Sequence, residues 1–247
     1  MNNVMRYAMA GCLAFAGTFA ARADASVVIG GTRVVYPAQD KEVTVKMTNE
    51  GTAPALVQVW LDDGDEKSTP DTAKVPFTVA PPIFRIDPKQ GQAVRVVYTK
   101  EPLPTDKESV FWVNMLEVPP KSADDGKNRL QFAFRTRIKL FFRPQGLPGE
   151  AGTAADKLTW KLAAGEGGKG VVVQANNPTP YFVSFAHVGL KIGERSIEGE
   201  GGMVAPGATA SFPVKELTSM PGSDAQAQFT TINDYGALNT IVKPLSR

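Results

Sequence analysis

Residues 130–143 alternate between apolar and polar side chains over an unusually long stretch. The even-numbered positions are Leu130, Phe132, Phe134, Thr136, Ile138, Leu140 and Phe142, and the odd-numbered positions are mostly Arg, Lys or Gln. Successive side chains of a β-strand point to opposite faces, so this period of two predicts a strand with one apolar and one cationic face. Fourteen extended residues span ~46 Å, against roughly 17 to 20 Å for a common strand.

A strand of that length exceeds what one small β-sandwich can bury. We therefore expect its first part, residues 130–134, to lack a partner within its own domain. An unpartnered apolar edge is the pattern of a strand that lends its side chains to another chain. A bent strand that changes sheets and stays buried fits the same sequence, and the sequence alone leaves both interpretations open.

Shorter runs of the same kind recur along the chain, and turn-forming residues such as Asp62-Asp63-Gly64 and Pro81-Pro82 separate them. The runs lie at residues 27–36, 43–48, 55–61, 93–98, 110–118, 158–162, 170–174, 181–188, 210–214 and 227–232. No stretch shows a sustained apolar stripe of helical period. The sequence therefore predicts an all-β fold built from antiparallel sandwiches or barrels.

The clearest boundary in the chain follows the long alternating stretch. Residues 144–149 read P-Q-G-L-P-G, and small residues continue to position 155. Runs of Pro and Gly between periodic segments are typical of linkers between domains. We therefore predict two β-domains, at residues 26–143 and 144–247.

Residues 1–25 read as a secretory signal peptide. A basic residue precedes the apolar run 7–21, which ends in small residues that match A-x-A-type cleavage sites. The run is too short for a good membrane span. Cleavage would leave a mature chain that starts at Ser26 and lacks Cys12, the single cysteine. A lipoprotein attachment site at this cysteine is the alternative, but the apolar run continues beyond it.

Charge and residue counts exclude several classes of function. Lys plus Arg total 27 and Asp plus Glu total 25, a balance that argues against a nucleic-acid-binding protein. One histidine, His187, and one cysteine are too few for ordinary zinc or iron–sulfur sites. A literal G-x-G-x-x-G at 165–170 precedes a valine-rich run instead of opening a helix, so it does not indicate a dinucleotide site. The tryptophans, all within strand patterns, are expected in the cores: Trp60, Trp112 and Trp160.

Five short segments stand out for their mixture of charged, aromatic and turn-forming residues. They are G-T-R-V-V-Y-P at 31–37, E-S-V-F-W-V-N at 108–114, R-I-K-L-F-F-R-P at 137–144, N-P-T-P-Y at 177–181 and T-I-N-D-Y-G-A at 231–237. In this order and spacing the set resembles the periplasmic chaperones of the chaperone–usher pathway, which assembles pili. The resemblance implies two immunoglobulin-like sandwiches set in an L with a cleft between them. It also implies a non-catalytic role without ATP or any cofactor: capture of pilin subunits in the periplasm and delivery to an outer-membrane usher.

The resemblance assigns Arg33 and Lys139 to the anchoring of a pilin subunit's C-terminal carboxylate. A guanidinium and an ammonium can share one carboxylate through charge-assisted hydrogen bonds. Without the resemblance, both residues read as ordinary solvated charges on strands.

The resemblance likewise makes Leu130, Phe132 and Phe134 the donor residues of a strand that completes the pilin fold. Their side chains would enter the groove of a pilin that lacks its own last strand, and backbone pairing would add affinity. Burial in the core of the first domain is the alternative for these three residues. If Phe132 and Phe134 are exposed, self-association of the unloaded chain becomes a further hypothesis.

The same resemblance places Glu108, Arg143 and Asp234 in an ionic network between the two domains, where the five donors of an arginine can serve two carboxylates. Pro81-Pro82 resembles a turn of the family, and the sequence does not decide whether it contains a cis bond. The compact connection at 119–129, together with a mature chain that lacks a cysteine pair, indicates the short-loop branch of the family.

Two other classes of protein fit part of the pattern. A secreted β-sandwich fibre subunit or adhesin would need its own donor extension, for which residues 26–32 are too short. A hydrolase would need a catalytic constellation centred on His187 or on acidic residues, with a positioned nucleophile.

Overall fold

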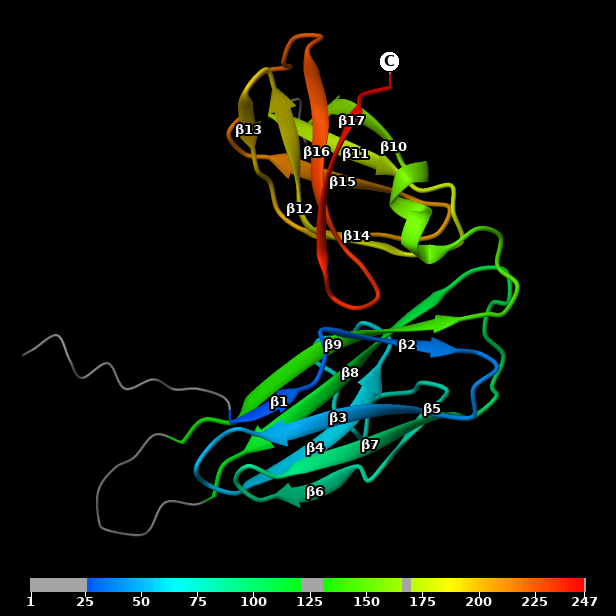
Figure 1. Cartoon of the computed structure of the whole chain (residues 1–247), viewed down its shortest axis with the longest axis vertical. Helices are drawn as coiled ribbons and strands as arrows, with labels where there is room; N and C mark the ends of the chain where they lie inside the picture. Colours follow the sequence, from blue (N-terminus) through cyan, green and yellow to red (C-terminus); the bar gives the residue numbers. More distant parts are fainter. Residues whose placement is uncertain (1–25, 121–130, 166–169, 247) are drawn as a thin grey trace, which may run out of the picture.

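The computed structural model describes residues 26–120, 131–165 and 170–246, which form two β-sandwiches set in an L (Figure 1). The expected signal peptide at 1–25, the donor residue Leu130 and most of the short connection at 119–129 lie outside these described residues. Each sandwich has its own buried apolar cluster. The predicted all-β class with two sandwich domains is confirmed.

The first sandwich packs a four-stranded sheet on a five-stranded sheet. The smaller sheet has the order β1 (Val27–Ile29), β3 (Val43–Asn49), β7 (Gly91–Tyr98), β5 (Phe77–Ala80). The larger has the order β2 (Arg33–Pro37), β9 (Phe134–Arg143), β8 (Ser109–Val118), β4 (Ala55–Asp62), β6 (Ile83–Ile86). Among these pairings, the pairing of β2 with β9 is parallel and the others are antiparallel.

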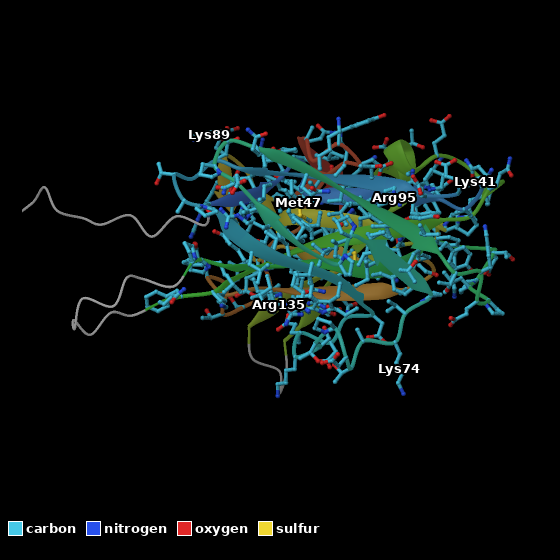
Figure 2. All side chains as sticks on the ribbon, turned by 90° about the horizontal axis from the view of Figure 1, so that it is seen from below. Lys41, Met47, Lys74, Lys89, Arg95 and Arg135 are labelled. Atoms are coloured by element: carbon cyan, nitrogen blue, oxygen red, sulfur yellow. The ribbon has the colours of Figure 1, made fainter. Side chains whose placement is uncertain are left out.

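Alternation along the strands explains the core of the first sandwich. Val45 and Met47 of β3 point inward and are buried, and Val113 and Met115 of β8 face them from the other sheet. Burial of each such side chain stabilises the fold by about 1.5 to 3 kcal/mol. Figure 2 shows Met47 among the interior side chains, whereas Lys74 and Lys89 lie at the periphery.

The second sandwich also consists of two sheets. One has the order β10 (Thr159–Ala164), β11 (Val171–Asn176), β15 (Thr209–Val214). The other has the order β13 (Arg195–Ile197), β12 (Val183–Ile192), β16 (Ala225–Ile232), β17 (Leu238–Pro244), with β14 (Gly202–Val204) also paired to β12. A 3-10 helix, Ala151–Lys157, precedes β10. Four aromatic rings pack together in this core: Trp160, Phe185, Phe212 and Phe229.

Several local predictions need correction. Strand β9 starts at Phe134, so the part of it that the structure describes has ten residues instead of the fourteen expected for 130–143. The expected strand at 27–36 is divided into β1 and β2, because Gly30 and Gly31 interrupt it. The sequence left open whether the proline turn contains a cis bond, and in the structure the peptide bond between Ala80 and Pro81 is cis. Strands β5, β6, β13, β14 and β17 were not predicted, because most are short or lack regular alternation.

Candidate binding cleft and open strand edge

The parallel pairing of β2 with β9 brings Arg33 and Lys139 into direct register. Residues in register on neighbouring strands project from the same face, so the two cations lie side by side on the outer face of the five-stranded sheet. The Arg33 Nη1 atom donates a hydrogen bond to the Ile232 carbonyl of the second domain, at 2.9 Å. Its Nε atom is buried and has no partner within the described residues.

Burial affects the charges of both side chains. Burial lowers the pKa of Lys139, and the neighbouring charge of Arg33 lowers it further. Burial also lowers the pKa of Arg33, and the carboxylate of Asp234 partly opposes that effect. Among the described ion pairs neither cation has a carboxylate partner. Two desolvated cations without a counter-ion form a site that favours an anion.

A cavity of about 280 Å³ lies between the two domains and includes Arg33 in its wall. The hydroxyl of Ser184, which is buried and has no partner within the described part of the chain, lines the same cavity. Arg33 and Ser184 thus both line the cavity, and each carries one buried donor without a partner among the described residues. Lys139 lies beside Arg33 on the next strand and is not part of this wall.

Arg143 bridges the two domains beside this cavity. Its Nε atom lies 2.6 Å from Oε1 of Glu108, and its Nη1 atom lies 2.8 Å from Oδ2 of Asp234, which belongs to the second domain. The other oxygen of Glu108 accepts a hydrogen bond from the backbone N–H of Phe182, at 2.8 Å. The structure therefore brings the three predicted network residues together and adds Phe182 as a fourth contact.

The electrostatics of this network follow from burial and pairing. Burial raises the pKa of Glu108, and the attraction of Arg143 only partly opposes that effect. Burial disfavours the charge of Arg143, but hydrogen bonds and charges from Asp234 and Glu108 outweigh it, so the pKa of Arg143 is raised. Arg143 therefore stays charged and holds both carboxylates.

The turn between β16 and β17 reaches toward β2 of the first domain (Figure 1). The Asn233 side-chain oxygen accepts hydrogen bonds from the backbone N–H groups of Tyr235 and Ala237, which fixes the shape of the turn. Gly236 has a φ of 83°, and a Cβ atom there would lie 2.5 Å from Oγ1 of Thr32. Tyr235 is 95% exposed and lines the mouth of the cavity.

Phe141 interrupts the otherwise mostly cationic face of β9. It is buried, and its ring lies 5.9 Å from the ring of Phe182 in the second domain. The guanidinium of Arg33 lies 5.8 Å from the centre of the same ring. Phe141 thus departs from the mostly cationic pattern of the odd-numbered positions because it packs between the two domains.

The outer edge of β9 is covered along only part of its length. Strand β2 pairs with residues 139–143, and within the described residues no strand pairs with the outer edge of residues 134–138. The inner edge of this segment pairs with β8. Phe134 is half-buried, and Phe132, just before the strand, is 59% exposed. The segment therefore offers unpaired backbone groups beside an exposed aromatic ring.

A buried carboxylate beneath the outer face of the sheet was missed in the sequence. Asp62 pairs with Arg137 and accepts hydrogen bonds from Asn114, Ser68 and the backbone of Gly64. The sequence suggested only turn formation at Asp62-Asp63-Gly64. Of the contacts of Asp62, that pattern indicates only the hydrogen bond from the Gly64 backbone.

The tryptophans are buried to different degrees. Trp160 is a core residue, as predicted. Trp60 is buried as well, at 7% exposed, and Arg135 stacks over its ring at 4.8 Å. Trp112 is only half-buried on the outer face of the larger sheet, where Arg137 stacks over its ring at 4.8 Å. The predicted core position is therefore wrong for Trp112, because cation–π stacking covers it in place of a second sheet.

Comparison with known proteins decides the family. A family model described as the pili and flagellar-assembly chaperone, PapD N-terminal domain, matches residues 26–148. The model of the pili assembly chaperone PapD, C-terminal domain, matches residues 153–242. The chain belongs to the pilus-assembly chaperone family. Proteins of this family are chaperones and not enzymes.

Individual relatives resemble the chain over most of its length. The chaperone protein FimB/FhaD of Bordetella pertussis is 43% identical over 91% of this chain and 90% of its own. The crystal structure of the CupB2 chaperone of Pseudomonas aeruginosa is 42% identical, with a TM-score of 0.75, and the match covers 89% of this chain and all of that one.

A third relative was solved together with a partner protein. The SafB chaperone of Salmonella enterica, in complex with the SafA pilin, is 29% identical, with a TM-score of 0.74 over 91% of this chain and 99% of that one.

In the part of the chain that the structure describes, no helix is long and apolar enough to cross a membrane.

Proposed function

We propose that this chain is a periplasmic chaperone that captures pilin subunits by donating an edge strand to them and delivers them to an outer-membrane usher. The family membership and the complex of the related SafB chaperone with the SafA pilin support this function. It requires neither ATP nor a cofactor. The apolar run at 7–21 supports export. We propose domain limits of 26–143 and 144–247, with the boundary at the start of the Pro- and Gly-rich segment.

The observation that carries the proposal is the pair of desolvated cations at one end of an open strand edge. Arg33 and Lys139 lie where β2 ends the open part of β9, and neither has a carboxylate partner among the described ion pairs. A polypeptide strand that pairs with residues 134–138 and runs parallel to β9, as β2 does, would bring its C-terminus to these two cations. A C-terminal carboxylate is the anion that suits this position.

The donor residues would act along the same edge. Phe132 and Phe134 would enter the groove of the subunit, and Leu130, beyond the described residues, would continue the series. Because backbone pairing tolerates shifts along the strand, the carboxylate anchor would set the register. We propose that Glu108, Arg143 and Asp234 hold the two domains at the angle that keeps the anchor accessible.

Replacing Arg33 tests the anchor. We expect Arg33→Ala to abolish the recovery of soluble pilin when the chain is co-expressed in the periplasm with pilin subunits of its own bacterium, because the tail would lose its main partner. The measurement is the amount of pilin that co-purifies with the tagged chaperone.

A matched control separates binding from folding. Arg195, in β13, forms an exposed ion pair with Glu216, so Arg195→Ala removes the same charge far from the cleft. Circular dichroism should show that both variants stay folded. If Arg33→Ala recovers as much pilin as Arg195→Ala, the anchor is wrong.

A further inference from the structure

A buried carboxylate of the first domain binds the residue at which the mature chain is expected to begin. Glu117, in β8, is 4% exposed. Its Oε1 atom accepts a hydrogen bond from the Ser26 backbone nitrogen at 3.1 Å and another from the Ser26 hydroxyl. Its Oε2 atom accepts one from the Val27 backbone nitrogen at 3.0 Å. Both oxygens are thus committed to the start of β1.

The carboxylate of Glu117 has no Lys or Arg side chain in contact with it among the described ion pairs. A buried charge that is not paired destabilises a protein strongly. A cation close to its oxygens would therefore complete the site.

The surroundings of Ser26 hold its nitrogen in place. The Ser26 carbonyl accepts a hydrogen bond from the Glu50 backbone at 2.7 Å. A Cβ atom on Gly51 would lie 2.5 Å from the Cβ of Ser26, so only glycine leaves room for the serine. Contacts on both sides therefore fix the distance between the Ser26 nitrogen and Glu117.

We propose that Glu117 is a receptor site for the free α-ammonium group of Ser26, which forms when the leader is removed at the Ala25–Ser26 bond. A processing peptidase adds water across this bond, leaving a carboxylate on Ala25 and an amine on Ser26. The amine takes up a proton at neutral pH, because α-amino groups titrate near pH ~7.7 to 8. The new cation lies next to the buried carboxylate, and the hydrogen bond at Ser26 becomes an ion pair.

Processing would thereby strengthen the end of the sandwich at which β9 begins. Glu117 is the register partner of Phe134, and β1 belongs to the opposite sheet. Figure 1 shows β1 beside the end of β8 and the start of β9. The ion pair would join the two sheets where the open edge starts. This inference rests on the export proposed above and is independent of pilin binding.

The experiment shifts the ammonium group by one residue. The chain is expressed from its full precursor, either as it is or with one glycine inserted between Ala25 and Ser26, so that the mature chain begins with that glycine. Intact mass measures the new N-terminus, and urea denaturation measures stability. In the natural chain we expect a start at Ser26, and we expect the insertion to increase the unfolding equilibrium constant by about tenfold or more.

The same insertion in a Glu117→Gln chain is the matched control. There we expect little further loss, because the carboxylate is already absent. An equal loss in both backgrounds, or no loss in either, would overturn the proposal. A natural chain that is processed at another bond would also overturn it, whereas an unprocessed chain would count against export itself.

A second measurement does not depend on how well Glu117→Gln folds. Cyanate carbamoylates free α-amines in their unprotonated form, so a buried and paired ammonium should react several-fold more slowly than the displaced one. We expect the natural chain to be protected relative to the glycine-extended chain. Equal rates of carbamoylation would contradict a bound ammonium.

Discussion

Asp62 illustrates how single residues organise the outer face of the first domain. Its side chain is 1% exposed, and Arg137 pairs with it while stacking on Trp112. Burial opposes ionisation of Asp62, but hydrogen bonds from Arg137, Asn114, Gly64 and Ser68 outweigh it, so its pKa is lowered. Because folding favours the charged form, Asp62 contributes stability above its unfolded pKa of about 3.9 and loses it as the pH falls through its folded pKa.

Replacement of this carboxylate should change stability and its dependence on pH. We expect Asp62→Asn to lower the free energy of unfolding by about 3 kcal/mol at pH 7, because it leaves buried donors without their charged partner. The loss should shrink under acid conditions, where the natural carboxylate is also protonated. Urea denaturation at neutral and acid pH measures both effects.

Asp87→Asn is the control, since Asp87 pairs with Arg85 on the surface and both side chains are largely exposed. Such a pair contributes about 0 to 1 kcal/mol, so this variant should unfold almost like the natural chain. Equal effects of the two substitutions would contradict the role given to Asp62.

The sequence allowed prediction of these residues to very different degrees. Arg33 and Lys139 could be named because short motifs surround both of them. Glu117 and Asp62 could not, because each is a carboxylate near the end of a strand that looks like any solvated charge. Their partners Ser26 and Arg137 are distant in the sequence, so burial becomes apparent only when the strands are assembled.

At the level of elements, β9 joins two environments in one strand. Its second half lies between β2 and β8, and within the described part of the chain its first half pairs with β8 alone. The alternation along the sequence predicted the strand and its two faces. It did not predict where the strand begins, because the apolar positions continue unchanged from Phe134 back to Phe132 although the regular pairing does not.

The exposed ring beside this edge should matter for association and little for folding. Because Phe132 is 59% exposed, we expect Phe132→Ala to leave the unfolding free energy within about 0.5 kcal/mol of the natural value. It should reduce the pilin that co-purifies, and it should weaken any self-association of the unloaded chain. Co-purification and sedimentation velocity over a range of concentrations measure these effects.

Ile83→Ala is the matched control, because Ile83 is 53% exposed on β6, at the opposite edge of the same sheet. It should leave pilin recovery unchanged. A Phe132→Ala chain that retains full pilin recovery would show that this ring is not part of the binding edge, and a chain that unfolds much more easily would show that the ring supports the fold.

For the whole molecule, the relative position of the two domains depends on a few polar contacts. Arg143 joins Glu108 to Asp234, and Arg33 contacts the carbonyl of Ile232. The sequence predicted two sandwiches and the three network residues by resemblance. It could not predict the contact of Glu108 with the Phe182 backbone, since a backbone N–H group leaves no signature in a sequence.

Removal of the bridging arginine should loosen this arrangement. We expect Arg143→Ala to lower the free energy of unfolding by about 3 kcal/mol, because it leaves Glu108 buried without its cation. Small-angle X-ray scattering should show a wider range of interdomain angles. Asp234→Ala should have a smaller effect, because the Asp234 side chain is 35% exposed. If Arg143→Ala scatters like the natural protein, the network does not set the angle.

Besides these charged contacts, the close approach of Gly236 to Thr32 limits sterically how the two domains pack. A single methyl group at position 236 would meet the threonine hydroxyl, and the left-handed backbone there would resist it as well. At this contact the two domains therefore approach so closely that not even one methyl group fits between them. A larger side chain at position 236 would push the turn between β16 and β17 away from Thr32, and the angle between the two domains would have to open.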